Sequence, residues 1–389
     1  MAPPAGRVEP HPLVFISAAE PSADLHGSNL IRAVADRCPN ARFVGVAGPR
    51  MRAAGCERIF DMTRHSAMLL GAVRSAGRAA QMLLTCAAYL RRFRFDAAVL
   101  IDSPTLHLPL ARRAHAAGVP VLYYIAPQMW AWGAYRIHRL RNDVERLAVI
   151  LPFEESYFRE RGVEATFVGH PLADAWATRS INRPAVEVIR AQGQPVVALL
   201  PGSRRHVVQE VLHGQLAVAD RIKAVLPQAS FGVSVANPQV APIISAMIGG
   251  HRTAVRAFSG GHAELLEAAD LVLVASGTST LEVAFHQRPM IVMYNASRIG
   301  YQLFARWFIR ARHLALPNIL AGREIVPEFM PYYNSIDPIA DRAVALLTSQ
   351  TARSEMCAAL AAIVEPLKAA RASQRTADLL LEMIRAGGH

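Results

Sequence analysis

Short apolar runs alternate with longer helical segments through both halves of this chain, and this pattern constrains the fold more than any other feature. The runs are rich in Val, Leu, Ile and Ala, as in the buried strands of parallel sheets. We predict strands at residues 13–17, 42–47, 97–101, 119–125, 146–151, 165–168, 195–200, 231–235, 271–274 and 290–294. Because strands that alternate with helices are typical of doubly wound sheets, we predict an α/β fold with a parallel sheet in each half.

The length of 389 residues leaves room for two such domains, each with its own core. Residues 179–194 are largely polar, and the alternation of strands and helices restarts after them. We therefore predict an N-terminal domain at 1–178, a linker at 179–194 and a C-terminal domain at 195–389. The last domain is predicted to end in a helical stretch at 336–385.

The chain is basic, with a formal net charge of +12, and nearly all of its cations are arginines. An excess of this kind favours an anionic partner, such as a nucleotide, a nucleic acid or an anionic membrane. The arginines are dispersed and accompany no recognisable nucleic-acid-binding module, so we do not expect nucleic acid to be the partner. Arginine binds phosphate in a bidentate manner, which suits a nucleotide.

The four cysteines lie far apart, without the spacing of a disulfide framework or a metal site. They are typical of reduced core residues, so we predict a cytoplasmic protein. The N-terminus lacks the pattern of a signal peptide, and no apolar stretch approaches the ~18 residues that a membrane-spanning helix needs. Any membrane contact is therefore predicted to be peripheral.

Two helical stretches are candidates for such contact. Residues 66–95 are rich in Ala and Leu and carry five arginines, and residues 303–311 place an apolar stripe between arginines. These patterns suit either an anionic lipid surface or a helix packed on a core with solvated arginines.

The turn after the strand at 271–274 is a candidate phosphate site. Ser276, Gly277 and Thr278 place small residues where the next helix begins, so unpaired N–H groups and a positive dipole end meet at one point. Glu282 lies in the first turns of that helix, within reach of a ribose hydroxyl beside the phosphate. The alternative is an ordinary helix start in which Glu282 favours the dipole.

A second candidate phosphate loop follows the strand at 195–200, where Pro201, Gly202 and Ser203 precede Arg204 and Arg205. The sequence contains no D-x-D pair and no cluster of carboxylates suited to a divalent ion, so we expect no metal cofactor. It also lacks the phosphate-binding patterns of P-loop NTPases and dehydrogenases.

In the first half, Asp102 follows the strand at 97–101 directly and is a candidate general base. Glu20, Ser22 and Asp24 fall in a predicted loop at 18–27, which would face the ligand side of the sheet. Helix capping is the alternative for each of these residues. Further along, His170 is a candidate ligand contact, and two tryptophans at 130 and 132 can wall an apolar pocket or fill the core.

Taken together, these segments resemble one family, the bacterial lipid-A-disaccharide synthases, which are GT-B glycosyltransferases with two Rossmann-like domains facing across a cleft. The resembling segments occur in family order at 44–51 (VGVAGPRM), 101–104 (IDSP), 124–132 (YIAPQMWAW), 150–154 (ILPFE), 167–170 (FVGH), 199–204 (LLPGSR), 275–282 (ASGTSTLE) and 316–324 (LPNILAGRE). The resemblance covers nearly the whole chain.

The resemblance implies an inverting transfer of a sugar from UDP-2,3-diacylglucosamine to the 6-hydroxyl of 2,3-diacylglucosamine 1-phosphate. The products are a β-1,6 disaccharide and UDP. It also implies a protein that needs no metal, lies peripherally on the inner membrane and can pair as a homodimer.

The family's residues map onto this sequence as follows. Asp102 matches the proposed base, and Glu20, Ser22 and Asp24 match the acceptor loop. The UDP site is matched by Arg204, Ser276, Gly277, Thr278, Glu282, Asn318, Gly322 and Arg323.

The chain departs from the family pattern chiefly in its first half. The acceptor loop has Ala19 and Ala23 where the family has glycines, and the pattern I-D-[AS]-P-D-F-N continues here as Thr105-Leu106-His107. A family Gly and Glu are missing at 67–72, and a later glutamine is replaced by Pro331. These changes leave open a divergent paralogue that binds UDP-sugar and uses another acceptor or does not turn over.

Overall fold

The computed structural model describes residues 11–61, 72–131, 133–295 and 313–387. The chain forms two compact units, which we describe separately. Unit 1 consists of Met1–Ala175 and Leu367–His389, and unit 2 consists of Trp176–Pro366.

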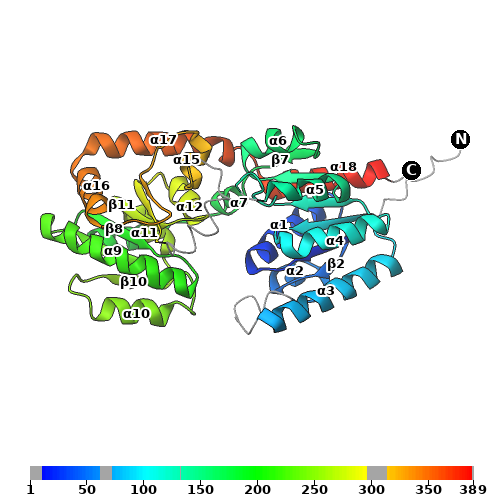
Figure 1. The fold of residues 1–389 in the computed structure, drawn as a ribbon, viewed down its shortest axis with the longest axis horizontal. Helices are drawn as coiled ribbons and strands as arrows, with labels where there is room; N and C mark the ends of the chain where they lie inside the picture. Colours follow the sequence, from blue (N-terminus) through cyan, green and yellow to red (C-terminus); the bar gives the residue numbers. More distant parts are fainter. Residues whose placement is uncertain (1–10, 62–71, 132, 296–312, 388–389) are drawn as a thin grey trace, which may run out of the picture. The chain divides into compact units, whose positions relative to one another are not determined.

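Unit 1 is built on a parallel sheet of seven strands in the order β3-β2-β1-β4-β5-β6-β7 (Figure 1). Chain order reverses between β1 and β4, as it does in Rossmann-type sheets, which bind ligands at this point. The strands are β1 (Leu13–Ala18), β2 (Arg42–Val46), β3 (Cys56–Phe60), β4 (Ala97–Ile101), β5 (Val121–Tyr124), β6 (Arg146–Val149) and β7 (Ala165–Phe167).

Helices cover both faces of this sheet. They are α1 (Pro21–Ala35), α2 (Pro49–Ala53), α3 (Ala72–Arg92), α4 (Pro104–Ala116), α5 (Ile137–Asp143), α6 (Pro152–Arg159) and α18 (Ala372–Gly387). Helix α7 (Pro171–Ala177) contains the boundary between the two units.

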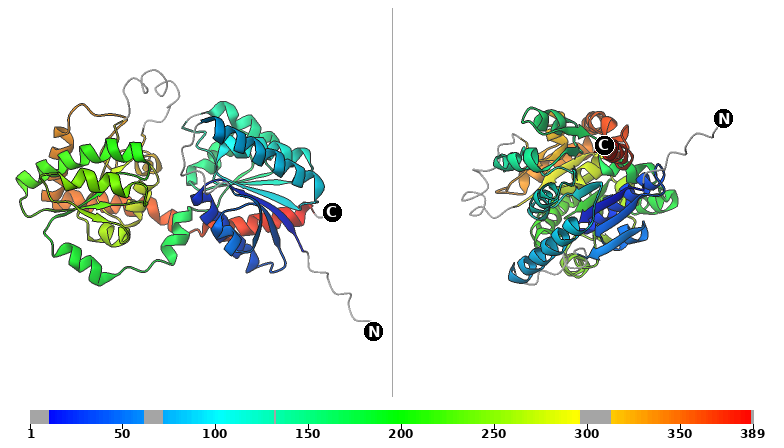
Figure 2. Two further views of the ribbon diagram at one scale, coloured as in Figure 1. Left: turned by 90° about the horizontal axis from the view of Figure 1, so that it is seen from below. Right: turned by 90° about the vertical axis from the view of Figure 1, so that its right-hand side faces the viewer.

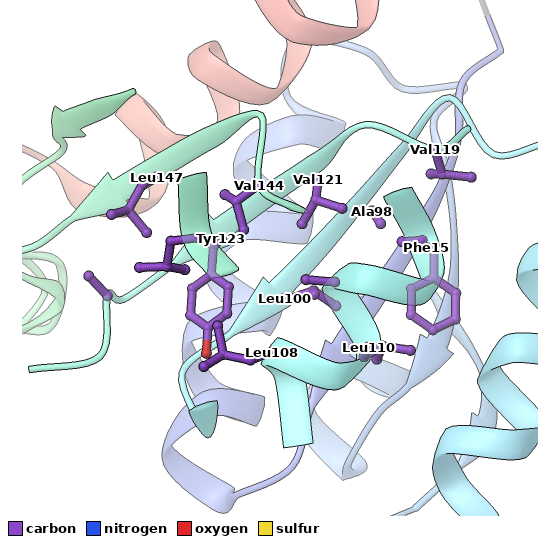
Figure 3. Close-up of a cluster of buried hydrophobic side chains, with 14 of the residues drawn as sticks. Phe15, Ala98, Leu100, Leu108, Leu110, Val119, Val121, Tyr123, Val144 and Leu147 are labelled. Carbon is purple, nitrogen blue, oxygen red and sulfur yellow. The ribbon is translucent and has the colours of Figure 1, made fainter. Parts of the chain in front are cut away.

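Successive residues of each strand of unit 1 point to opposite faces and enter two separate cores. On one face, Phe15 and Leu100 pack with Met82 of α3 and with residues of α4 (Figure 3). On the other face, Ile16 packs with α1 and with Leu380 of α18. Because both faces are buried, the central strands β1, β4 and β5 are apolar along nearly their whole length, which is the pattern that predicted them.

Helix α18 returns the end of the chain to unit 1. It lies beside α1, as the red helix in Figure 2 shows, and Arg37 forms an ion pair with Asp378 at 2.5 Å. Asp174 accepts a hydrogen bond from the backbone N–H of Ser373 at 2.9 Å, at the start of α18. The division therefore differs from the predicted one, in which residues 195–389 form a single domain.

Unit 2 contains a parallel sheet of six strands in the order β10-β9-β8-β11-β12-β13, with its reversal between β8 and β11. The strands are β8 (Val196–Leu200), β9 (Ser230–Ser234), β10 (Arg256–Phe258), β11 (Leu271–Ala275), β12 (Met290–Met293) and β13 (Glu328–Phe329). Its helices are α8 (Arg183–Arg190), α9 (Arg205–Val225), α10 (Ala241–Gly249), α11 (His262–Ala268), α12 (Ser279–Phe285), α15 (Leu316–Ala321), α16 (Asp337–Thr348) and α17 (Gln350–Lys368).

The predicted linker at 179–194 contains helix α8, which belongs to unit 2. Asn182 caps the helix through the N–H of Ala185, and Val186 and Ile189 are buried. The helix packs on α11, and Arg183 forms an ion pair with Glu267 at 3.1 Å. Among the described helices, none is both long and apolar enough to cross a membrane.

Candidate active site

The loop after β8 lies at the reversal point of the unit 2 sheet. Gly202 has φ +102, a conformation that favours glycine, and it leads to the exposed Arg204 immediately before α9. Asn237 donates a hydrogen bond to the carbonyl of Ser203 at 2.9 Å, so the loop after β9 steadies the loop after β8. The Arg204 guanidinium is thus carried at the edge where ligands bind in such sheets.

The turn after β11 lies next to this loop, because β8 and β11 are neighbours in the sheet. Gly277 has φ +138 and is exposed, as is Thr278, whereas Ser276 is half-buried. The hydroxyl of the buried Thr280 donates a hydrogen bond to the Gly277 carbonyl at 2.7 Å, which fixes the conformation of the turn. The N–H groups at the start of α12 therefore sit on a defined, accessible turn.

Glu282 on α12 forms an ion pair with a histidine at the start of helix α11. The Glu282 carboxylate lies 3.2 Å from Nε2 of His262, and Nδ1 of the same ring lies 2.7 Å from the Ser234 hydroxyl at the end of β9. Burial raises the pKa of Glu282, but the charges of His262, Arg179 and His286 and a hydrogen bond from His262 outweigh it and lower the pKa overall. The carboxylate is therefore ionised and partly accessible.

Asn318 on α15 occupies a fully buried position, with 0% of its surface exposed. Its Oδ1 accepts from the N–H groups of Ile325 and Val326 at 2.7 and 2.9 Å, and its Nδ2 donates to the Val326 carbonyl and to Glu328 at 2.9 and 3.1 Å. These four bonds use the hydrogen-bonding capacity of the amide, so Asn318 shapes the loop after α15 and has no polar atom left for a ligand.

The neighbouring positions Gly322 and Arg323 are both exposed on that loop. Gly322 ends α15 with φ +65, and α15 packs against α12. The structure therefore places Arg323 on a loop next to the helix that carries Glu282.

In unit 1, Asp102 follows β4 at the reversal point of the sheet and has a strained backbone. Asp102 has φ +53 and Ser103 has φ +46, which cost non-glycine residues about 1 to 3 kcal/mol each. The Asp102 carbonyl accepts hydrogen bonds from the Tyr123 hydroxyl at 2.6 Å and from Nδ1 of His107 at 2.7 Å. Burial raises the pKa of the Asp102 carboxyl, although a backbone hydrogen bond from Ser103 opposes this effect.

Asp24 is buried and structural, with 2% of its surface exposed. Its carboxylate accepts hydrogen bonds from the N–H groups of Gly48, Arg50 and Met51 at 2.9, 2.9 and 3.1 Å, and so caps helix α2. A side chain at position 48 would collide with this carboxylate. The capping alternative describes Asp24 better than an acceptor contact does.

The predicted loop at 18–27 is mostly helix, because β1 continues to Ala18 and α1 begins at Pro21. Glu20 and Ser22 are exposed at the start of α1. Ala19 and Ala23 are buried with ordinary negative φ, so this backbone does not require glycine at either position.

His170 and Trp130 both serve the local structure. Nδ1 of His170 accepts from the N–H of Leu172 at 3.2 Å, and burial lowers the pKa of His170 to about 3. Trp130 donates to the buried Glu154 at 2.9 Å. Positions 67–71, Trp132 and the stripe at 303–311 lie outside the described residues.

Each unit thus brings several of the predicted residues to the carboxyl edge of its own sheet. Unit 2 gathers Arg204, the turn at 276–278 and Glu282, and unit 1 places Asp102 on the edge that also carries Glu20. Sequence reasoning missed Ser234 and His262. The pair Gly260-Gly261, both with positive φ, marks the turn from which His262 projects. Among the described residues, no group of three or more His, Cys, Asp or Glu side chains is arranged to hold a metal ion.

The chain is similar to known proteins over nearly its whole length. The family described as Lipid-A-disaccharide synthetase matches residues 14–380. A lipid-A-disaccharide synthase of Anaeromyxobacter dehalogenans is 37% identical over 96% of this chain and 97% of its own. That of Nitrosococcus oceani is 35% identical over 96% of each.

Solved structures share the fold at low sequence identity. MurG of Acinetobacter baumannii has a TM-score of 0.58 at 14% identity, covering 96% of this chain and 100% of its own. A UDP-GlcNAc 2-epimerase of Neisseria meningitidis, bound to UDP-GlcNAc, has a TM-score of 0.59 at 10% identity, covering 96% and 99%. The fold is GT-B, as predicted, and the chain belongs to the lipid-A-disaccharide synthase family of glycosyltransferases.

Proposed function

We propose that this protein transfers 2,3-diacylglucosamine from UDP to the 6-hydroxyl of 2,3-diacylglucosamine 1-phosphate, with inversion at the anomeric carbon. The products are the β-1,6 disaccharide 1-phosphate and UDP. The observation that carries the proposal is the pairing of the Arg204 loop with the turn at 276–278, on neighbouring strands at the reversal point of unit 2.

The donor site is assigned to unit 2. Arg204 and the N–H groups at the start of α12 would bind the diphosphate, where a guanidinium and backbone amides offset its charge without a metal ion. The ionised Glu282 would accept hydrogen bonds from ribose hydroxyls. Gly322 and Arg323 would flank the same site from the loop after α15. Asn318 holds that loop through hydrogen bonds to its backbone and would make no contact with the ligand.

The catalytic base is assigned to Asp102. Its carboxylate would take the proton from the acceptor 6-hydroxyl as the oxygen forms its bond to the anomeric carbon and the bond to the UDP oxygen breaks. The electron pair of the broken bond leaves on the diphosphate, where Arg204 stabilises it. The raised pKa of Asp102 suits a base that must hold this proton. Glu20 and Ser22, exposed at the same edge, would contact the acceptor.

A peripheral inner-membrane contact is proposed for helix α3, since both substrates carry acyl chains. Leu84 and Phe93 are exposed large apolar side chains, with 68% and 42% of their surfaces accessible. Phe93 directly follows α3 and is flanked in sequence by the exposed Arg91, Arg92 and Arg94. Apolar side chains flanked by arginines suit the surface of an anionic membrane. Dimerisation stays a prediction from the family resemblance.

The alternative is a paralogue that binds UDP-sugar but uses another acceptor, as the departures in the first half suggest. An assay distinguishes the two functions. Purified protein is mixed with UDP-2,3-diacylglucosamine and 2,3-diacylglucosamine 1-phosphate, and the UDP and disaccharide that form are measured. Formation of both supports the proposal. UDP binding without disaccharide would favour the paralogue, and absence of UDP binding would reject both.

A further inference from the structure

His107 is a departure from the family pattern that the proposed function does not yet use. It stands where the pattern I-D-[AS]-P-D-F-N has Asn, and it is fully buried, with 0% of its surface exposed. Its ring connects two strands. Nδ1 contacts the carbonyl of Asp102, after β4, at 2.7 Å, and Nε2 contacts the Ser17 hydroxyl, in β1, at 2.8 Å.

The chemistry of the two partners fixes the tautomer. The Asp102 carbonyl can only accept, so Nδ1 of His107 must carry the hydrogen. Nε2 then has a lone pair, and the Ser17 hydroxyl donates to it. Burial lowers the pKa of His107 to about 4, although hydrogen bonds to backbone carbonyls oppose this effect, so the ring is neutral at pH 7.

The same Asp102 carbonyl also accepts the Tyr123 hydroxyl at 2.6 Å. It belongs to the first of two successive non-glycine residues with left-handed backbone, φ +53 and φ +46. A strained turn persists only where its surroundings fix it. Here two buried side chains, His107 from α4 and Tyr123 from β5, both donate hydrogen bonds to the Asp102 carbonyl, where the turn begins.

We propose that His107, together with Tyr123, is a positioning residue that holds the turn at 102–103 so that the Asp102 carboxylate keeps its place at the edge of the sheet. This inference rests on the proposed function, in which Asp102 is the base. An Asn at position 107 also offers one donor and one acceptor, which explains how one pattern accommodates either residue. The departure at His107 therefore preserves the site.

The test compares His107→Leu, His107→Asn and Tyr123→Phe in the full chain, with His115→Leu as a matched control at an exposed position of the same helix. Turnover, KM for both substrates, UDP affinity and the pH profile of kcat/KM are measured. His107→Leu is expected to lower kcat roughly ten- to hundredfold, the cost of misplacing a reacting group by about 1 Å. UDP affinity stays unchanged, because the UDP site is assigned to unit 2.

The pH profile separates positioning from mere stability. A loosened turn exposes the Asp102 carboxylate to water, so the acid limb of the profile moves to lower pH in His107→Leu. His107→Asn is expected to recover most of the lost turnover, and His115→Leu to match the wild type. Unchanged kcat and an unmoved acid limb in His107→Leu would overturn the inference.

If His107→Leu does not fold, as judged by UDP binding, Tyr123→Phe decides the question. Tyr123→Phe removes the other hydrogen bond to the Asp102 carbonyl. It is expected to lower kcat by less than His107→Leu does and to move the acid limb of the pH profile in the same direction. Full turnover and an unmoved limb in that variant would equally reject the inference. Failure of the proposed function is distinguished by Asp102→Asn, since full turnover there rejects the base itself.

Discussion

At the scale of single residues, Asp102 carries the sharpest prediction. Replacing its carboxylate with an amide in Asp102→Asn removes the proton acceptor and leaves the backbone turn in place. We expect kcat to fall by roughly 10²- to 10⁴-fold, the range typical of a general base, while UDP affinity measured by calorimetry is retained. Turnover equal to that of the wild type would reject the assignment.

The pair of Glu282 and His262 leads to a prediction about donor binding. Glu282→Gln removes the charge that faces His262 at 3.2 Å and weakens the acceptor proposed for ribose. We expect UDP affinity to fall roughly tenfold, in keeping with about 1.5 kcal/mol for a hydrogen bond to a charged group. Glu187→Gln, at an exposed position on α8, is the control. Unchanged UDP affinity in Glu282→Gln would remove the residue from the site.

Glu154 gives a pH-dependent prediction. Burial raises the pKa of Glu154 to about 7 from 4.5, although hydrogen bonds from Trp130, Leu151 and Ile150 oppose the rise. The fold therefore favours the protonated form, and its stability is predicted to fall as pH rises from about 4.5 to about 7. The loss is about 3 kcal/mol at roughly 1.4 kcal/mol for each pH unit.

Urea denaturation of the wild type and of Glu154→Gln between pH 4.5 and 8 measures this loss. The difference between the two proteins isolates Glu154 from His107 and His170, whose lowered pKa values act in the opposite direction below pH 6.5. A difference that does not vary with pH would contradict the prediction.

The sequence predicted which residues lie at strand ends, but it could not predict where their side chains point. Asp24 and Asn318 are polar residue types that often contact ligands. Each side chain instead accepts hydrogen bonds from the backbone of another segment inside its own unit. Conversely, the ion pair between Glu282 and His262 forms only because the segments that follow β11 and β10 meet at one edge of the sheet. The central strands, and the sheet edge in each unit on which Asp102 or Arg204 lies, follow from local pattern alone.

At the scale of elements, helix α3 carries the prediction about membranes. Substituting Leu84→Ser in the helix and Phe93→Ser directly after it removes two exposed apolar side chains. We expect binding to vesicles containing phosphatidylglycerol to fall roughly a hundredfold or more, since burying each such side chain contributes about 1.5 to 3 kcal/mol and about 1.4 kcal/mol corresponds to a factor of ten. Val188→Ser, which is 58% exposed on α8, is the matched control. Equal flotation of all variants would rule out this surface.

The elements that the sequence did not predict share one physical cause. Strands β3, β10 and β13 lie at sheet edges and carry charged or half-exposed residues, so they lack the continuous apolar run of a central strand. Strands β10 and β13 are also short, with three and two residues. Helix α8 was predicted to be linker because it is polar overall, yet Val186 and Ile189 give it one apolar stripe. The central strands, buried on both faces, were predicted closely.

At the scale of the whole molecule, the return of α18 decides which fragments can fold. Residues 1–178 alone lack Leu380 and its neighbours, which complete one of the two cores of unit 1. We expect this fragment to aggregate, and co-expression with residues 367–389 to restore soluble material. Residues 176–366 should unfold cooperatively on their own. A soluble, cooperatively folding 1–178 fragment would contradict this division.

The domain boundary was the one large-scale feature that local pattern could not supply. Composition marks where an alternation restarts, but it does not say on which sheet a later amphipathic helix will dock. Helix α18 packs on α1 and on the core of one sheet face, a surface that exists only once the sheet of unit 1 has formed.

Synthesis runs from the N-terminus, and the last helix completes a core whose first strand emerges at residue 13. The inserted unit, residues 176–366, is contiguous and can close while translation continues. The first sheet to be synthesised is therefore completed only after unit 2 has been made, because the burial of one of its faces needs residues 372–387.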